Sequence, residues 1–478
     1  MASHPPRADR FRYDGFDLDP NRRHVACHYS TGGHRFTEQV TLDVGGEGTG
    51  EGWRTPAAVA AARLLYLVAG VSYYKTAAPP VVDLGDLAVT EAERALLWHV
   101  YVDGLAEFAF RQGLDLSRIR IEGGAEPVRP GADQVGTGQG GGAWRAPVVA
   151  APPAARDAPS GTERRGSGRP LVPFGGGIDS IVTAEAVRAR HPNAALFVVS
   201  RAGDRFEAIE RAALATGLPV VRAWREIDPG VLRSGELGFL NGHVPVTGIL
   251  SAIAVLAAVV GGHDAVVMAN EWSASVATRT VGGRPVNHQY SKSLAFEKGL
   301  RRVLEDAAVP VQYFSLLRPY SELWVARRFA ELPRYHATFR SCNRSFVLDP
   351  AGRLDHWCGR CDKCCFVDLI LAPFVPREQL VAIFGGREPL EDPALAGRFR
   401  ALLGTSGEDK PFECVGDVGE CRTALLMAAE RPDRSGPLLA SLAAEVRAAG
   451  GGPSPESLLA PMGEHCIPDE FALEDQLV

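Results

Sequence analysis

Three glycines at positions 175–177 lie between the apolar stretch Leu171–Phe174 and a helix-like stretch that contains Asp179 and Ser180. A strand that passes through glycines into a helix presents several backbone N–H groups to an anion, and the positive end of the helix dipole adds to the attraction. Glycine is needed because a phosphate must approach the backbone where a Cβ atom would block it. These residues therefore predict a phosphate-binding loop; a glycine turn without a ligand is the alternative.

The loop lacks the two commonest nucleotide-binding patterns. The Walker A string GxxxxGK[ST] occurs nowhere in the chain, and three contiguous glycines do not fit GxGxxG. The string instead resembles the SGGxDS loop of the PP-loop ATP pyrophosphatases, which implies binding of ATP and Mg²⁺ and release of AMP and pyrophosphate. The first serine of that family is a glycine here, which removes one hydroxyl donor. The residues that the resemblance assigns to ATP and Mg²⁺ are Gly175, Gly176, Gly177, Asp179 and Ser180.

Polar residues follow two further strand-like stretches. Ser200 and Arg201 come after LFVV, at the junction where a PP-loop fold usually meets adenine and ribose, so the resemblance implies that they contact the nucleotide. An ordinary strand and turn is the alternative for this pair. Asn270 and Glu271 follow AVVMA, and ligands of parallel sheets bind beyond the carboxyl ends of the strands. We therefore expect Asn270 and Glu271 to belong to the cofactor site as well.

Five of the nine cysteines lie between positions 342 and 365, and three of them are spaced as CxxCxxC. Four thiolates from two backbone segments suit a tetrahedral metal ion, and Cys342 or Cys365 could be the fourth ligand. A similar CGxCxxC closes a structural zinc site in the PP-loop enzymes that make 7-cyano-7-deazaguanine. Reduced thiols without metal and an iron–sulfur or redox site are the alternatives. The expected zinc ligands are Cys342, Cys358, Cys361 and Cys364.

Several side chains are chemically able to act as acid or base. The stretch Asn287–Lys292 is favoured as the source of the catalytic base, and a solvated loop without a catalytic role is the alternative. A cysteine of the cluster is a further candidate for the base if zinc is absent. The stretch Pro411–Cys421, PFECVGDVGEC, is interpreted as a hinge or lid, or as ordinary structure. The candidate catalytic residues are His243, His288, Tyr290 and Lys292.

The elements that must position these residues change along the chain. Residues 1–122 combine short strands with helix-like stretches, which predicts an N-terminal α+β domain. Residues 123–168 are rich in Gly, Pro and Ala, which predicts a flexible linker. Strand and helix patterns alternate over 169–375, which predicts an α/β domain with a parallel sheet and helices on both faces. The residues from 376 to 478 are Ala- and Leu-rich and predict helices.

Composition limits the class of protein. A chain of 478 residues predicts two or three domains, and 51 basic against 57 acidic residues argue against a protein that wraps nucleic acid. The N-terminal stretch lacks the apolar core of a secretory signal, which predicts a cytoplasmic protein. The long uncharged stretch Val244–Gly262 is interpreted as a buried helix because it contains Pro and polar residues, so no membrane association is expected. The oligomeric state is not indicated.

Motifs along most of the chain resemble the UDP-N-acetylmuramoyl-L-alanyl-L-glutamate epimerases, bacterial enzymes of peptidoglycan precursor synthesis. They are FRYDGFDLDP, HVACHYS, GHRFTEQV, PFGGGIDSIVT, MANEWSAS, VNHQYSKS, CGRCDKC and PFECVGDVGEC. The resemblance implies a UDP-linked muramoyl dipeptide as substrate, ATP with Mg²⁺, and structural zinc. It also implies epimerisation of the terminal L-Glu to D-Glu through an acyl-adenylate, with release of AMP and pyrophosphate.

Two other functions are compatible with the glycine loop. The first is a PP-loop amidating, nitrile-forming or thiolating enzyme that acts on a deazapurine or tRNA. Such an enzyme should need ammonia, a glutamine amidotransferase or a sulfur donor, and a tRNA-binding enzyme should carry a basic domain that this acidic chain does not show. The second is a nucleotide-binding module without turnover, which the replacement of the loop serine by Gly175 mildly favours.

Overall fold

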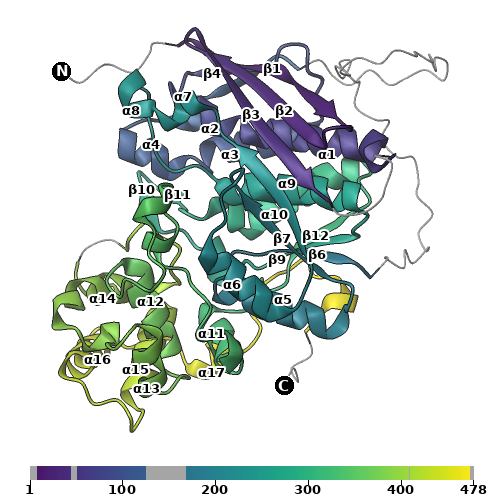
Figure 1. The fold of residues 1–478 in the computed structure, drawn as a ribbon. Helices are drawn as coiled ribbons and strands as arrows, with labels where there is room; N and C mark the ends of the chain where they lie inside the picture. Colours follow the sequence, from purple (N-terminus) through teal and green to yellow (C-terminus); the bar gives the residue numbers. More distant parts are fainter. Residues whose placement is uncertain (1–7, 45–50, 125–167, 408–409, 474–478) are drawn as a thin grey trace.

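The structure is a computed structural model, and it describes residues 8–44, 51–124, 168–407 and 410–473. A ten-stranded sheet runs through it in the order β12-β9-β6-β7-β8-β3-β2-β1-β4-β5. Figure 1 shows the long strands β1, β2 and β3 of this sheet side by side. Six of the nine neighbouring strand pairs are parallel. The predicted linker at 123–168 falls almost entirely outside the described residues.

One half of the sheet contains five parallel strands. Their residues alternate between two cores: Leu171 and Val266 face one, whereas Val172 and Val267 face the other. Strands that are buried on both faces need apolar residues at consecutive positions, which explains the runs in the sequence. These strands are β6 Pro170–Pro173, β7 Ala195–Ser200, β8 Val220–Glu226, β9 Ala265–Met268 and β12 Gln312–Ser315. The predicted parallel sheet of this region is confirmed.

The other half of the sheet comes from the N-terminal residues. Three long strands form an antiparallel meander, and two short strands continue the sheet in parallel to the first of them. The third strand also pairs antiparallel with β8, from Gln39 opposite Glu226 to Asp43 opposite Arg222. One sheet therefore joins strands from both sides of 125–167. These strands are β1 Arg10–Asp19, β2 His24–Thr31, β3 His34–Asp43, β4 Val81–Asp83 and β5 Arg120–Glu122.

Helices cover both faces of the sheet (Figure 1). The apolar helix α9, Val246–Gly261, is almost completely buried, which confirms the interpretation of this stretch as a core helix. Among the described residues, the stretch Pro56–Tyr74 is long and apolar enough to cross a membrane, and 83% of its apolar window is buried within the protein. The other helices on the sheet are α1 Pro56–Ala69, α2 Val71–Tyr74, α3 Glu91–Val102, α4 Ala106–Gln112, α5 Ile178–Arg190, α6 Glu207–Thr216, α10 Leu294–Asp306 and α11 Glu322–Ala330.

The C-terminal residues fold into a helical lobe, coloured green to yellow in Figure 1. The lobe shares a hydrophobic core with α5, α11 and one face of the sheet. The helical structure predicted after residue 376 is therefore confirmed. The helices of the lobe are α12 Asp362–Leu371, α13 Arg377–Ile383, α14 Ala396–Leu403, α15 Val418–Ala429, α16 Pro437–Ala448 and α17 Pro455–Leu459.

Candidate functional site

The glycine loop connects β6 to the start of α5. Gly176 has a φ of +74°, and a Cβ atom there would lie 2.8 Å from the carbonyl oxygen of Ala208. Its own carbonyl oxygen accepts a hydrogen bond of 3.1 Å from the backbone N–H of Arg340. Gly177 is the N-cap residue of α5. Backbone conformation and close packing thus require glycine at position 176.

Gly175 has a different environment. It is exposed, and a Cβ atom added there would meet nothing within 4 Å. The missing serine of the motif is therefore not explained by a lack of space. The hydroxyl of Ser180 donates a 3.0 Å hydrogen bond to the carbonyl oxygen of Gly177 at the start of α5.

A cavity of about 930 Å³ lies beside the loop, at the carboxyl ends of β7 and β8. Ala208, which packs against Gly176, forms part of its wall. Arg353 pairs with Asp204 through contacts of 2.5 and 2.7 Å, and its guanidinium group lies 3.9 Å from the centre of the Phe206 ring. The predicted nucleotide contacts Ser200 and Arg201 line this cavity, together with Arg205, Glu207, Arg222, Trp224, Arg340 and Ser345.

Three carboxylates converge at the loop. Asp179 lies in the first turn of α5, Glu271 follows β9, and Glu322 is the first residue of α11. One carboxylate oxygen of each lies within 4.8 Å of the other two. Glu420 lies beside them and accepts a 3.1 Å hydrogen bond from the backbone N–H of Glu322. Sequence reasoning assigned Asp179 and Glu271 to the site but missed Glu322.

The crowding of negative charge affects these carboxyl groups. Burial, followed by the charge of Glu271, raises the pKa of Asp179 to about 6. Burial and the charge of Asp179 raise the pKa of Glu322 well above its usual value. Three oxygen donors at this spacing suit a hard cation such as Mg²⁺, which would offset the repulsion.

Two lysines lie next to the carboxylates. The ammonium group of Lys292 donates hydrogen bonds to the side-chain oxygen of Gln289 at 2.9 Å and to the sulfur of Cys414 at 3.4 Å. Lys363, in the first turn of α12, donates to the backbone carbonyl oxygen of Cys414. Both ammonium groups interact electrostatically with Asp179 and with the Cys414 thiol.

Cys414 forms a chain of contacts with His288 and Glu107. His288 hydrogen-bonds to the Cys414 sulfur, and its Nδ1 bonds to the carboxylate of Glu107. Burial raises the pKa of Cys414, but the charges of Lys292 and His288 outweigh burial and bring it to about 6. Burial lowers the pKa of His288, yet its bonds to Cys414 and Glu107 raise it to about 9. A thiolate and an imidazolium therefore lie side by side.

The predicted acid–base residues are only partly brought together. Lys292 and His288 belong to the cluster around Cys414. The ring of His243 contacts that of His288, with ring centres 4.3 Å apart and planes tilted by 35°. The Tyr290 ring packs instead in the core, near His99 and Phe296. Its side chain is therefore not brought to the cluster.

Sequence reasoning also missed Cys414 and Glu107. Cys414 contacts Lys292 and His288, and Glu107 contacts His288. Cys414 lies within PFECVGDVGEC, a stretch whose sequence suggests a hinge or lid, or ordinary structure, and not a catalytic group. Glu107, on α4, gives no signal in its own sequence context because it meets His288 only through folding.

The four cysteines of the predicted metal site converge. The sulfur atoms of Cys342, Cys358, Cys361 and Cys364 all lie within 4.8 Å of one another. The sulfur of Cys364 is 3.6 Å from that of Cys358 and 3.4 Å from that of Cys361. Tetrahedral zinc with bonds of about 2.3 Å separates sulfur atoms by about 3.8 Å, so the thiols fit such an ion closely. Cys365 is buried nearby and does not belong to this group.

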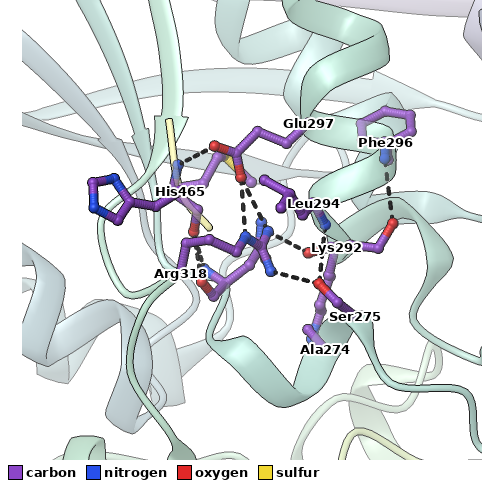
Figure 2. Close-up of polar contacts among 12 residues, drawn as sticks. Ala274, Ser275, Lys292, Leu294, Phe296, Glu297, Arg318 and His465 are labelled. Atoms are coloured by element: carbon purple, nitrogen blue, oxygen red, sulfur yellow. Dashed lines mark hydrogen bonds and ion pairs between the residues drawn. The ribbon is translucent and has the colours of Figure 1, made fainter. Parts of the chain in front are cut away.

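A buried ion pair fixes the backbone of the site. Figure 2 shows Arg318 bonded to Glu297, and their side chains are 1% and 2% exposed. Arg318 also donates hydrogen bonds to the carbonyl oxygens of Glu271, at 2.8 Å, and Lys292, at 2.6 Å. Asn270, another predicted site residue, is held through its backbone, which bonds to the hydroxyl of Ser315.

Comparisons with known proteins cover nearly the whole chain. Residues 2–316 match the family model described as the MurL N-terminal domain, and residues 338–454 match the MurL C-terminal domain. Three similar proteins are each named UDP-N-acetyl-alpha-D-muramoyl-L-alanyl-L-glutamate epimerase. One from Xanthomonas oryzae pv. oryzae is 42% identical over 78% of this chain and 75% of its own. One from Salinispora tropica is 39% identical, over 91% and 88%, and one from a Micromonospora species is 37% identical, over 98% and 97%.

Proposed function

This chain belongs to the MurL epimerase family, and we propose that it inverts the α-carbon of the terminal L-Glu of UDP-MurNAc-L-Ala-L-Glu. The proposed reaction consumes ATP, passes through an acyl-adenylate of the glutamyl carboxylate, and releases AMP and pyrophosphate. In this proposal the enzyme has a PP-loop fold and acts in the cytoplasm on a precursor of peptidoglycan.

The chemistry explains why an epimerase needs ATP. A Cα–H beside a carboxylate is very weakly acidic, because loss of the proton adds a second negative charge next to the first. Each pKa unit corresponds to about 1.36 kcal/mol. The substrate nitrogen is already part of a peptide bond, so it cannot form a Schiff base with pyridoxal. Adenylation removes the charge of the carboxylate and creates an acyl group that can accept the electron pair of the broken C–H bond.

The observation that carries the proposal is the meeting of the glycine loop, the three carboxylates and the two lysines. Asp179 belongs to both the loop helix and the carboxylate cluster. We propose that Asp179, Glu271 and Glu322 hold Mg²⁺, which when bound would neutralise phosphate charge. The loop would bind the β,γ-phosphates, and the cavity lined by Ser200 and Arg201 has the size and position to receive adenosine.

Lys292 and Lys363 have the charge required at the reacting carboxylate. Each interacts electrostatically with both Asp179 and Cys414. A positive group in this position attracts the substrate carboxylate and offsets the negative charge that develops during adenylation. We expect the glutamyl side of the substrate to bind at the Cys414 end of the site, away from the cavity.

We also propose that the four clustered cysteines hold a structural zinc ion. Cys342 follows Arg340 by two residues, and the backbone N–H of Arg340 supports the carbonyl oxygen of Gly176. Lys363 lies between Cys361 and Cys364 in the sequence. Zinc would therefore brace the glycine loop and direct one of the two lysines, without taking part in the reaction.

The test is an assay of the purified protein with ATP, Mg²⁺ and UDP-MurNAc-L-Ala-L-Glu. AMP release and the configuration of the glutamyl residue are followed together, in D₂O. The expected result is AMP release with formation of D-Glu that carries deuterium at Cα. AMP release without inversion, or only in the presence of ammonia, would contradict the epimerase proposal.

An Asp179→Asn variant tests the assignment of the loop. AMP release should fall by about 100-fold or more, because the variant lacks one of the carboxylates proposed to hold Mg²⁺. Glu331→Gln, at the exposed C-terminus of α11, is the matched control and should keep full activity. Full activity of the Asp179 variant would show that the loop has another role.

A further inference from the structure

We propose that Cys414 is the base that removes the Cα proton of the adenylated glutamyl residue, with His288 and Glu107 as residues that position and charge it. This inference rests on the proposed function and names the acid–base group that the function requires. Three parts of the chain supply the group: α4 carries Glu107, the segment after β11 (Arg284–Val286) carries His288, and the segment before α15 carries Cys414.

The contacts form a continuous chain. The two oxygens of Glu107 have different partners: one bonds to Nδ1 of His288, and the other accepts a 2.6 Å hydrogen bond from Arg111. His288 in turn hydrogen-bonds to the sulfur of Cys414. The side chains of Glu107 and His288 are only 5% and 13% exposed. A carboxylate that holds a histidine, which in turn holds a nucleophilic or basic group, is an arrangement suited to activating that group.

Charge favours the thiolate over the thiol. The ammonium group of Lys292 lies 3.4 Å from the sulfur, and Lys363 bonds to the carbonyl oxygen of the same residue. Cys414 is partly accessible, in contrast to the fully buried Cys27 and Cys421. A partly accessible residue at this position can contact a substrate that enters the site.

Cys414 differs from the other cysteines outside the metal cluster, all of which lie in the part of the chain that the structure describes. Burial raises the pKa of Cys27, Cys365, Cys421 and Cys466. These four thiols remain protonated at neutral pH and are unsuited to accept a proton. Among these five, the sulfur of Cys414 is the one that is hydrogen-bonded by both a histidine, His288, and a lysine, Lys292.

The position fits the reaction sequence. Both lysines interact with Asp179 and with Cys414, so an acyl group held at the lysines lies near both the proposed phosphate site and the thiolate. The thiolate takes the Cα proton: an S–H bond forms, the C–H bond breaks, and the electron pair moves to the acyl oxygen. A proton from solvent then adds to Cα on the opposite face, and the electron pair forms the new C–H bond, which inverts the configuration. Water then hydrolyses the acyl-adenylate, so that AMP leaves and the carboxylate is restored, and the thiol releases its proton to solvent.

A Cys414→Ser variant separates the two steps. We expect this variant to release AMP from ATP and the L-Glu substrate at a rate within about tenfold of the wild-type rate. Inversion and incorporation of deuterium at Cα should fall by about 10²–10⁴-fold, the usual contribution of a general base. Cys466→Ser, a change at a partly buried cysteine near Lys298, is the matched control and should behave as wild type.

Alkylation gives a second readout that does not depend on turnover. Iodoacetamide at pH 7 should modify Cys414 faster than Cys466, as followed by mass spectrometry of the peptides. His288→Asn should slow the modification of Cys414 by about tenfold or more, because the thiolate loses its positive partner. A purely structural histidine would leave this rate unchanged.

The outcomes distinguish the two proposals. If the wild-type protein releases no AMP and inverts no substrate, both the function and the role of Cys414 are overturned. If the wild type releases AMP and inverts Glu while Cys414→Ser inverts it equally fast, only the role of Cys414 is overturned. An equal loss of AMP release and inversion in a folded Cys414→Ser variant would also overturn it, since the thiol would then serve adenylation.

Discussion

Arg318 and Glu297 form a fully buried ion pair, and the same guanidinium group holds the backbone of two residues of the site, Glu271 and Lys292. The pair thus connects a strand end with the short turn before α10. Among the contacts described, neither side chain bonds to the carboxylate groups of Asp179, Glu271 or Glu322. Arg318 therefore acts on the site through the backbone, as a positioning residue.

This relationship predicts that stability and activity can be separated at Arg318. Arg318→Met should lower the free energy of unfolding by about 3–5 kcal/mol, because Glu297 becomes a buried charge without its partner. The double variant Arg318→Met with Glu297→Gln should recover part of this loss but not the inversion rate, because the carbonyl oxygens of Glu271 and Lys292 still lack their donor. Urea unfolding and the epimerisation assay measure the two effects. Equal recovery of both would contradict a positioning role.

The glycine loop predicts opposite effects at neighbouring positions. Gly176→Ala should weaken ATP binding strongly. A positive φ costs alanine about 1–2 kcal/mol of conformational free energy, and its Cβ atom would lie 2.8 Å from the Ala208 carbonyl oxygen. Gly175→Ala adds the same atom into open space and is the matched control. Gly175→Ser should fold and bind ATP at least as well as wild type, since it restores the hydroxyl donor of the motif. Isothermal titration with ATP and Mg²⁺ measures all three, and equal affinities for the two alanine variants would refute the argument.

The carboxylate cluster predicts a dependence on Mg²⁺. Without the cation, Glu322→Gln should raise the free energy of unfolding by about 1 kcal/mol, because it removes a buried carboxyl group whose ionisation burial and the charge of Asp179 disfavour. With ATP and Mg²⁺, the same variant should release AMP about 100-fold more slowly or worse. Thermal unfolding with and without Mg²⁺, beside the AMP assay, tests this combination. A variant that is both less stable without Mg²⁺ and fully active would count against a cation site.

The pKa values at Cys414 and His288 predict a pH profile for inversion. Cys414 faces His288, Lys292 and Lys363. Its pKa of about 6 means that the thiolate is lost as the pH falls below 6, whereas the imidazolium of His288, with a pKa of about 9, is lost as the pH rises above 9. Inversion should therefore be fastest between these values and half-maximal near each. The expected rise near pH 6 contrasts with the usual thiol pKa of about 8.5, and a rise near 8.5 would show that the thiol is not activated.

If the cysteine cluster holds the proposed zinc ion, loss of the metal should affect the proposed nucleotide site. Elemental analysis should find about one zinc per chain. Cys361→Ser should lower the zinc content and weaken ATP binding, because the backbone at Arg340 that supports Gly176 is no longer anchored. Cys365→Ser, a change at a buried cysteine outside the cluster, should keep its zinc. A metal-free protein with normal ATP affinity would exclude this role.

Local patterns made part of this site predictable from sequence. The glycine loop and the CxxCxxC motif are each contained in a short stretch, and their residues are found together in the structure. The alternation of strands and helices also predicted the parallel half of the sheet, because buried strands require continuous apolar runs. These features depend on neighbours in the sequence.

Long-range contacts could not be predicted in the same way. Glu107 and His288 are 181 positions apart and meet only because α4 packs against the segment after β11. Cys414 and Glu322 lie in stretches whose residue types are compatible with ordinary loops and helix starts. The pairing of β3 with β8 was also missed, because nothing in either strand identifies its partner.

That pairing connects the amino-terminal strands to the half of the sheet that carries the cavity. Arg222 and Trp224 of β8 line the cavity, and the same residues pair with Asp43 and Thr41 of β3. The strand that forms part of the cavity wall thus belongs to the same continuous sheet as β1, β2 and β3. Substitutions in β3 are therefore expected to affect the cavity through the hydrogen-bonded pairing with β8, so the amino-terminal strands form part of the structural support of the proposed nucleotide site.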